Sequence, residues 1–526
     1  MFKSLSMEKK FQIYLTLLAL LGLVFVLIAT SKYGAGVSSD AGRNLSTADS
    51  LLNGKGFVDF AGAPFVLWPP LYPFVMVGLS WLTKWSVFQS AWYLNVVLYA
   101  VNIWLSGWLL YLIFKEKPIY AWVGALMILL SRSTLRIYAN VASEPLFVTF
   151  MLIFFFAAAK YLRDNSWQAL WLMFIMAGLG TFQRYLGVVL FGVAGLVVIF
   201  KEQWRGVWRS ILPGVISVLP IGAWALLHNI PISGAPFGPR AYGDMFPLEN
   251  ISLSLTKILW WFIPRLSFLD PLLLRPWIIL VGLILFLIVI NKKTDWLNWL
   301  KELSGVYLWP ALLFSIVYFF LLAFTVITAD HLDLTSDRYY VIIHPIVLAF
   351  LFITLDKLVF SHINFNTRVM NYSMIAFVGL WFIYPLYAVQ GYLRLSLVQG
   401  EPSNYNVANS AQYREMGVVK AAQNIIGENP SATLYTNYMN IVWFIYQRPV
   451  TQLPFIDSTQ SRNERSAALQ KYYPGWPADK PGYIIWFTPN QYHFYAPPDD
   501  LSSIADLKLL YQDKTGEIYY VQAKAP

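Results

Sequence analysis

Long apolar runs alternate with short polar connections over the first three quarters of the chain. A bilayer core about 30 Å thick requires roughly 20 apolar residues for each crossing helix. Eleven runs come close to this length, and they cover residues 11–30, 87–114, 118–136, 145–160, 168–182, 186–200, 211–228, 276–290, 304–328, 339–356 and 371–391. The pattern predicts an α-helical polytopic membrane protein with about eleven transmembrane helices.

Lysine and arginine gather at alternate connections between these runs. The basic connections carry Lys115 and Lys117, Lys160 and Arg163, Lys201, Arg205 and Arg209, Lys292 and Lys293, and Lys357 with Arg368. Short cytoplasmic loops carry an excess of Lys and Arg, so these connections are predicted to be cytoplasmic. The first run has no convincing cleavage site and is interpreted as an uncleaved span. We therefore expect a plasma-membrane protein with a cytoplasmic amino terminus and with everything after Tyr392 outside.

One further apolar stretch, 67–81, is almost long enough to cross but contains the double proline Pro69-Pro70. If it crossed, every later basic connection would change sides, which contradicts the charge pattern. It is therefore predicted to be an interfacial helix within a first outer loop, 31–86. A second interfacial helix is expected in the outer loop 229–275, around the aromatic residues of 260–262.

The last part of the chain is more polar. Short β-like runs at 432–435, 483–487, 507–511 and 517–521 alternate with turns and with a helical stretch at 413–426. This pattern predicts a small α/β domain on the outer side. The expected division is a transmembrane domain at 1–391 and an extracytoplasmic α/β domain at 392–526.

Composition supports the membrane class. The chain is 57% hydrophobic and only 13% charged, against roughly 25% charged residues in soluble domains. Its formal net charge is +10, but the basic residues are scattered between apolar runs, which argues against a nucleic-acid partner and leaves membrane lipids as the expected surroundings. The chain has no cysteine, which excludes disulfides, thiol nucleophiles and cysteine metal sites.

Two carboxylates at the outer ends of spans are candidate catalytic residues. Asp40 in the first outer loop could accept a proton from a substrate hydroxyl or amine, but it also suits the start of a helix predicted at 41–52. Glu144 precedes Pro145 where a span begins, a position that also favours an acidic residue next to the helix dipole. His344 is the main ionisable residue inside a span and is interpreted as a packing residue. Transporters usually keep ionisable groups at mid-membrane, so this distribution argues against one.

Cations lie on the same predicted face, at Arg43, Arg184, Arg240 and Arg338. A single arginine at a membrane edge usually contacts lipid headgroups, whereas several that converge can bind a phosphate bidentately. The acidic residues Asp330, Asp333 and Asp337 are interpreted as solvated loop charges, since they lack the glycine and glutamate of a calcium loop.

Seven short motifs occur in a characteristic order, at 39–40, 52–57, 68–73, 143–147, 178–187, 234–240 and 336–340. Together they resemble the GT-C superfamily of membrane glycosyltransferases over about three quarters of the chain. The resemblance is to relatives of protein O-mannosyltransferases, aminoarabinose transferases and lipopolysaccharide-core glycosyltransferases, which take a sugar from a polyprenyl phosphate. The chain departs from them at Asp40-Ala41, where many relatives have paired acidic residues, and at Leu67-Trp68, where the aminoarabinose branch has Glu-Lys.

The resemblance implies roles for individual residues. Asp40 is the expected catalytic base, and Glu144 is the second acidic position, which in relatives positions the acceptor or, in some, a divalent metal. Residues expected to contact substrate are Arg338, Arg240, Arg184 and Arg43 at the donor phosphate and Tyr72, Tyr185 and Tyr339 elsewhere in the site. No metal ligands are assigned, and Mg²⁺ or Mn²⁺ remains an open alternative.

The predicted function is inverting transfer of a sugar from a polyprenyl-phosphate donor to a glycan, lipid or protein acceptor on the outer face of the membrane. Two other classes stay open. A secondary transporter or lipid flippase would explain the spans, and a non-enzymatic membrane assembly protein would use the α/β domain to bind partners.

Overall fold

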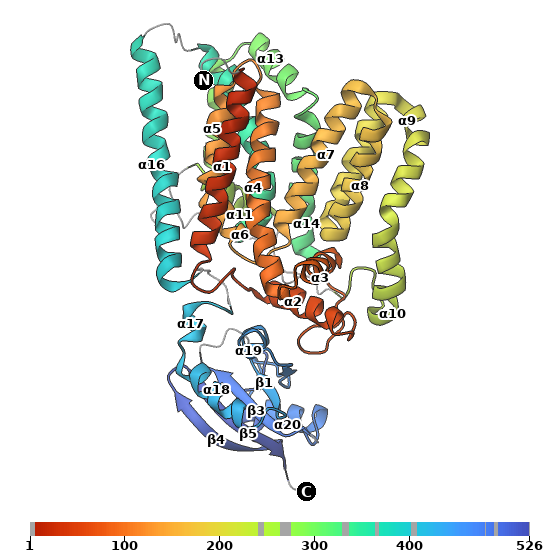
Figure 1. The fold of residues 1–526 in the computed structure, drawn as a ribbon, viewed down its shortest axis with the longest axis vertical. Coiled ribbons are helices and arrows are strands. Elements are labelled where there is room, and N and C mark those ends of the chain that lie inside the picture. Colours follow the sequence, from red (N-terminus) through yellow and green to blue (C-terminus); the bar gives the residue numbers. More distant parts are fainter. Residues whose placement is uncertain are drawn as a thin grey trace. The chain divides into compact units, whose positions relative to one another are not determined.

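The fold comes from a computed structural model that describes residues 6–239, 247–262, 275–328, 336–362, 368–400, 408–478, 480–488 and 493–524. The chain divides into two compact units (Figure 1). The first unit contains Met1–Ile28, Val66–Tyr72 and Ala91–Arg394, and the second contains Ala29–Phe65, Pro73–Ser90 and Leu395–Pro526. Arg240, Asp330 and Asp333 lie outside the described residues.

Helices make up the first unit. They are α1 (Met7–Ala29), α4 (Val87–Ile113), α5 (Ile119–Leu129), α6 (Arg132–Tyr138), α7 (Glu144–Asp164), α8 (Trp167–Gln183), α9 (Val188–Trp224), α10 (Ile230–Ser233), α11 (Pro247–Leu259), α12 (Arg275–Ile290), α13 (Lys293–Leu303), α14 (Trp309–Thr328), α15 (His344–Thr354) and α16 (Arg368–Gln399). Each predicted apolar run contains a helix, but the run 118–136 does not form a single span, because it divides into α5 and α6 at Leu130 and Ser131. The runs 186–200 and 211–228 share α9, whose backbone breaks at Gln203 (φ 55°, ψ −143°).

Within the described residues, five helical segments are long and apolar enough to cross a membrane. They are Met7–Ala29, Val87–Ile113, Glu144–Asp164, Tyr185–Ser233 and Asp337–Val359. Shorter apolar helices accompany them at Leu71–Thr83, Ile119–Leu129, Leu280–Ile290 and Trp309–Thr325. The chain is therefore a helical membrane protein, as its apolar pattern predicts.

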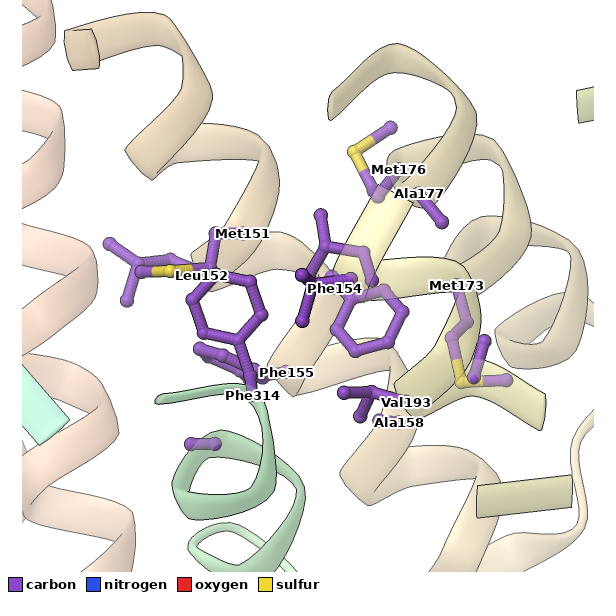
Figure 2. Close-up of a cluster of buried hydrophobic side chains, with 14 of the residues drawn as sticks. Met151, Leu152, Phe154, Phe155, Ala158, Met173, Met176, Ala177, Val193 and Phe314 are labelled. Carbon is purple, nitrogen blue, oxygen red and sulfur yellow. The ribbon is translucent and has the colours of Figure 1, made fainter. Parts of the chain in front are cut away.

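The best-packed region of the first unit lies between α7, α8, α9 and α14. Phe155 of α7 and Phe314 of α14 pack edge to face with ring centroids 5.7 Å apart, beside Met173 of α8 and Val193 of α9 (Figure 2). At Gly178 of α8 an added Cβ would lie 2.3 Å from the Ser217 carbonyl oxygen of α9. Small residues at such a crossing let two helix backbones approach closely, which is how membrane helices pack without a hydrophobic driving force.

Two helices form in the predicted first outer loop. They are α2 (Ser39–Leu52) and α3 (Leu71–Thr83), where the sequence predicts helices at 41–52 and 67–81. The second loop also contains a helix, α11, but it ends at Leu259. Trp260–Phe262 form a turn after it, so the aromatic residues follow the helix that they were expected to occupy.

The second unit contains a five-stranded sheet in the order β2-β1-β3-β5-β4. Its strands are β1 (Thr433–Thr436), β2 (Thr451–Gln452), β3 (Gly482–Phe487), β4 (Ala505–Asp513) and β5 (Gly516–Ala523), and its helices are α17 (Ala411–Arg414), α18 (Gly417–Glu428), α19 (Met439–Tyr446), α20 (Arg462–Tyr472) and α21 (Pro498–Leu501). The pairs β1–β2 and β1–β3 are parallel, whereas β3–β5 and β4–β5 are antiparallel. The predicted small α/β fold at the carboxyl end is confirmed, with each predicted strand overlapping an observed one.

The predicted topology can be tested because the chain has no cysteine. Both Glu116, after α4, and Gln512, on β4, are exposed. We expect Gln512→Cys to react with a membrane-impermeant maleimide in intact cells and Glu116→Cys to react only after permeabilisation. Labelling of Glu116→Cys in intact cells would contradict the assignment of the basic connections to the cytoplasm.

Candidate active site

Three helix ends in the first unit bring charged side chains together. Glu144 opens α7, Arg184 follows the last turn of α8, and Arg338 lies in a short 3-10 helix, Asp337–Tyr339. The backbone of Arg184 is extended, with φ −151° and ψ 131°, so α8 ends there. With Tyr318 and Tyr339, these residues are called the Glu144 cluster below.

A buried carboxylate lies at the centre of the cluster. One guanidinium nitrogen of Arg184, Nη1, is 2.5 Å from Glu144 Oε1, and Arg338 Nε is 3.8 Å from the same oxygen. The side chain of Glu144 is 3% exposed, that of Arg184 is 15% exposed and that of Arg338 is 30% exposed. Two guanidinium groups therefore lie within 4 Å of one carboxylate oxygen. A partly exposed guanidinium next to a buried pair can bind an anion such as a phosphate.

Neighbouring groups orient the two arginines. Arg184 Nη1 donates to Ser143 Oγ at 2.9 Å, and Arg338 Nη2 donates to the Tyr339 hydroxyl at 2.7 Å. The guanidinium carbons lie 5.9 Å and 4.8 Å from the centroid of the Tyr339 ring, so both cations contact the ring electrostatically. The Tyr318 hydroxyl donates to the Tyr339 carbonyl at 3.1 Å, which ties α14 to the cluster.

The remaining predicted tyrosines differ in their surroundings. Burial raises the pKa of the Tyr72 phenol above its ordinary value, and the negative charge of Glu144 adds to the shift. Tyr72 is therefore a buried neutral phenol near the cluster. Tyr185 instead accepts a hydrogen bond from Asn229 Nδ2 at 3.1 Å, and its ring packs against Phe237. The structure brings together Glu144, Arg184, Arg338 and Tyr339, while the substrate roles of all these residues stay predictions.

Asp337 and Lys257 form a second charged pair, which was not predicted from the sequence. Asp337 Oδ2 accepts a hydrogen bond from Ser133 Oγ at 2.8 Å, and Asp337 Oδ1 is 3.9 Å from Lys257 Nζ of α11. The side chain of Asp337 is 22% exposed, so its interpretation as a solvated loop charge was wrong. The position of Asp337 directly before Arg338 could have marked it as a site residue. Its partner Lys257 could not be found in this way, because Lys257 lies far away in the sequence.

An apolar groove of about 310 Å³ runs between α9 and α14. It is lined by Val188, Val189, Gly192, Val193, Leu196, Val317 and Leu321. A single 3-10 turn, Tyr185–Gly187, separates Arg184 from the first lining residue, and Tyr318 of the cluster directly follows the lining residue Val317. Arg184 and the first lining residue are therefore four positions apart in the chain, and Tyr318 is on the same helix as two lining residues.

Asp40 and Arg43 belong to the second unit. Ser38 caps α2, since its hydroxyl accepts a hydrogen bond from the Ala41 amide at 3.3 Å. Asp40 lies in the first helical turn and is half-buried. Arg43 forms an ion pair with Asp59, whose side chain is 3% exposed. The role of Arg43 at a phosphate stays a prediction, while its observed partner is a carboxylate that the sequence analysis did not single out.

The surroundings of Glu144 do not fit a divalent cation. Two guanidinium groups lie within 4 Å of its carboxylate and would repel Mg²⁺ or Mn²⁺, which prefer several oxygen ligands. Among the described residues, no group of three or more His, Asp or Glu side chains could hold a metal ion. His344, the ionisable residue inside a span, is buried and hydrogen-bonded to Thr134 Oγ1 at 3.3 Å.

Solved structures resemble the whole chain. ArnT from Cupriavidus metallidurans in the apo state aligns with a TM-score of 0.54 and 14% identity, over 96% of this chain and 97% of that chain. The chain has the fold of ArnT. The same protein bound to undecaprenyl phosphate aligns with a TM-score of 0.54 and 13% identity over the same shares. This likeness confirms the GT-C-like fold that the sequence motifs predict.

A weaker likeness is to the arabinofuranosyltransferase AftD from Mycobacteria, with a TM-score of 0.44 and 12% identity over 97% of this chain and 42% of that chain. The fold assignment does not depend on it. No model of a protein family matches the sequence, and no curated protein matches it. At such identities the comparisons establish the fold alone, so the roles of side chains rest on chemistry and geometry.

Replacing Arg184 with methionine should destabilise the protein, because Glu144 would lose the cation that contacts it. Breaking a buried pair from one side costs about 3–5 kcal/mol, and the nearby Arg338 favours the lower end of that range. Arg163→Met is the matched control, since its pair with Asp164 is exposed and worth about 0–1 kcal/mol. Thermal unfolding in detergent measures both variants, and equal midpoints would contradict a structural role for the Glu144–Arg184 pair.

Proposed function

We propose that the protein is a glycosyltransferase that takes a sugar from a polyprenyl-phosphate donor at the outer face of the membrane. The carrying observation is that the first unit holds both two arginines around Glu144 and an apolar groove of about 310 Å³ whose lining begins four residues after Arg184. A ligand with an anionic head and a long apolar chain matches both parts. The fold supports the proposal, since ArnT, which shares it, has been solved with undecaprenyl phosphate bound.

In this proposal the two arginines bind the donor phosphate. Arg338 is the more exposed of the two and is the primary phosphate ligand. Arg184 is held in place by Glu144 and contributes a second guanidinium group. The phosphate leaves with the electron pair of the bond to the anomeric carbon. Fixed cations stabilise the negative charge that develops on it and need no reorganisation during the reaction.

Asp40 is the proposed general base. Its carboxylate accepts the proton of an acceptor hydroxyl or amine while that group attacks the anomeric carbon opposite the phosphate, which inverts the configuration. The position of Asp40 supports this role, because Ser38 already caps α2 and Asp40 is half-buried. Such base catalysis contributes about 10²–10⁴-fold. No step requires a metal ion.

The alternatives fit the charge distribution less well. A secondary transporter concentrates ionisable groups near mid-membrane, at broken helices. Here Glu144 begins α7 and Arg184 follows the end of α8, so the cluster lies at helix ends. A non-enzymatic assembly protein gains nothing from a buried carboxylate flanked by two cations, since burying charges costs stability.

Replacing Asp40 with asparagine should lower turnover by about 10²–10⁴-fold and leave folding intact. The matched control is Asp49→Asn, which removes an exposed carboxylate from the same helix. The assay measures release of polyprenyl phosphate from polyprenyl-phospho-sugars in membranes that contain extracted acceptors. Wild-type turnover in Asp40→Asn would exclude this residue as the base.

A Cβ atom can be added to a residue that lines the apolar groove without a steric clash. An added Cβ at Gly192 meets no atom within 4 Å, and the same holds at Gly195 on the same helix, but only Gly192 lines the groove. Gly192→Leu should therefore raise KM for a long polyprenyl donor about tenfold, the effect of losing one or two buried methylene contacts.

Two comparisons control this experiment. Gly195→Leu should leave KM unchanged, and a donor with only two isoprene units should not distinguish Gly192→Leu from the wild type. Equal KM values for the long donor in both variants would mean that the chain of the donor does not occupy this groove.

A further inference from the structure

The segment that carries Asp40 is anchored on its amino-terminal side by Asn409. The side chain of Asn409 is almost fully buried. Its Oδ1 accepts a hydrogen bond from the Val37 amide at 3.0 Å, and its Nδ2 donates to the carbonyls of Tyr33 and Ala35 at 3.0 and 2.6 Å. The Ala408 amide also donates to the Val37 carbonyl at 2.8 Å. Four hydrogen bonds thus join the chain before Asp40 to the start of the carboxyl-terminal α/β segment, defined here as 408–524.

The same segment is anchored on its carboxyl-terminal side by α19. A Cβ added at Gly42 of α2 would lie 3.2 Å from the Cβ of Asn440, so the two helices touch where glycine leaves room. Further along, the Phe60 carbonyl accepts a hydrogen bond from the Val450 amide at 3.1 Å, and the Phe60 and Trp443 rings pack with centroids 5.9 Å apart. Helix α2 and the loop after it therefore rest on α19 and on the chain that follows it.

Asp40 lies between these two anchors, and all of these contacts belong to the second unit. We propose that the carboxyl-terminal α/β segment is a positioning element, in which Asn409 and α19 hold the backbone on both sides of Asp40. This inference rests on the proposed function, because it assigns the α/β segment a role in presenting the base to the acceptor. Misplacement of a catalytic group by about 1 Å can cost 10²-fold in rate.

Asn409→Ala tests the amino-terminal anchor, since it removes all three side-chain hydrogen bonds and adds no bulk. Turnover should fall by about ten- to a hundredfold, with KM for the donor unchanged, because the phosphate ligands lie elsewhere. Asn409→Asp retains the acceptor for the Val37 amide but loses both donor hydrogen bonds and sets an oxygen against the carbonyls of Tyr33 and Ala35, so its turnover should fall as well. Hydrogen–deuterium exchange at 33–52 should become faster in Asn409→Ala.

A matched control separates positioning from a general loss of stability. Ser461 caps α20 through a capping box with Glu464 in the same unit, so Ser461→Ala weakens the α/β segment at another place. It should leave both turnover and exchange at 33–52 at wild-type values. A turnover loss in Ser461→Ala as large as in Asn409→Ala would overturn the positioning role.

The carboxyl-terminal anchor has a test that needs no activity. The natural chain has no cysteine, and the Cβ separation of 3.2 Å between positions 42 and 440 is close to the 3.5–4.5 Å of a disulfide. Gly42→Cys combined with Asn440→Cys should form an intramolecular disulfide under mild oxidation, whereas Gly42→Cys combined with Ser461→Cys should not.

These experiments separate failure of the positioning role from failure of the proposed transferase function. Unchanged exchange in Asn409→Ala, or no selective disulfide, would overturn the inference whether or not the protein has transferase activity. Faster exchange with unchanged turnover would overturn it as well, because the position of Asp40 would then not limit the reaction. Absence of polyprenyl phosphate release by the wild type would instead reject the proposed function, and exchange and cross-linking would then decide whether the α/β segment holds this loop.

Discussion

The candidate site depends on the buried ion pair between Glu144 and Arg184. Burying either charge alone would be costly, so the start of α7 and the end of α8 must meet for both charges to be compensated. The apolar packing of α7, α8, α9 and α14 holds these helices together. With the pair in place, Arg338 approaches the same carboxylate and Tyr339 contacts both guanidinium groups. One carboxylate thereby positions two cations.

In the proposed function, a lipid-linked donor requires both a cationic cluster and an apolar groove. A polyprenyl phosphate joins a hydrated anion to a long hydrocarbon chain, so its site needs cations at one end and apolar walls beyond them. Helix α14 takes part in both, since Tyr318 belongs to the Glu144 cluster while Val317 and Leu321 line the groove. In the proposed function, the helical first unit recognises the donor and the second unit carries the base.

Much of the architecture was predictable because a bilayer imposes a length and a polarity on each crossing segment. The apolar runs and the double proline predicted the helices, and short β-like runs predicted the strands. Helix α19 was missed, since its residues 441–446 are continuously apolar and could equally form a buried strand. The aromatic residues at 260–262 were misplaced because interfacial aromatics also occur in turns next to helices.

The sequence by itself determined the membrane class, the predicted membrane sides and the residue types available for catalysis, since these follow from local polarity and charge. Only the tertiary structure decided which charges meet. Glu144 pairs with Arg184, Arg43 with Asp59, and Lys257 lies near Asp337. Two of these pairs join positions that are far apart along the chain. An ion pair forms only where the two charged groups lie within about 4 Å, so a partner is fixed by how the helices pack and not by its place in the sequence.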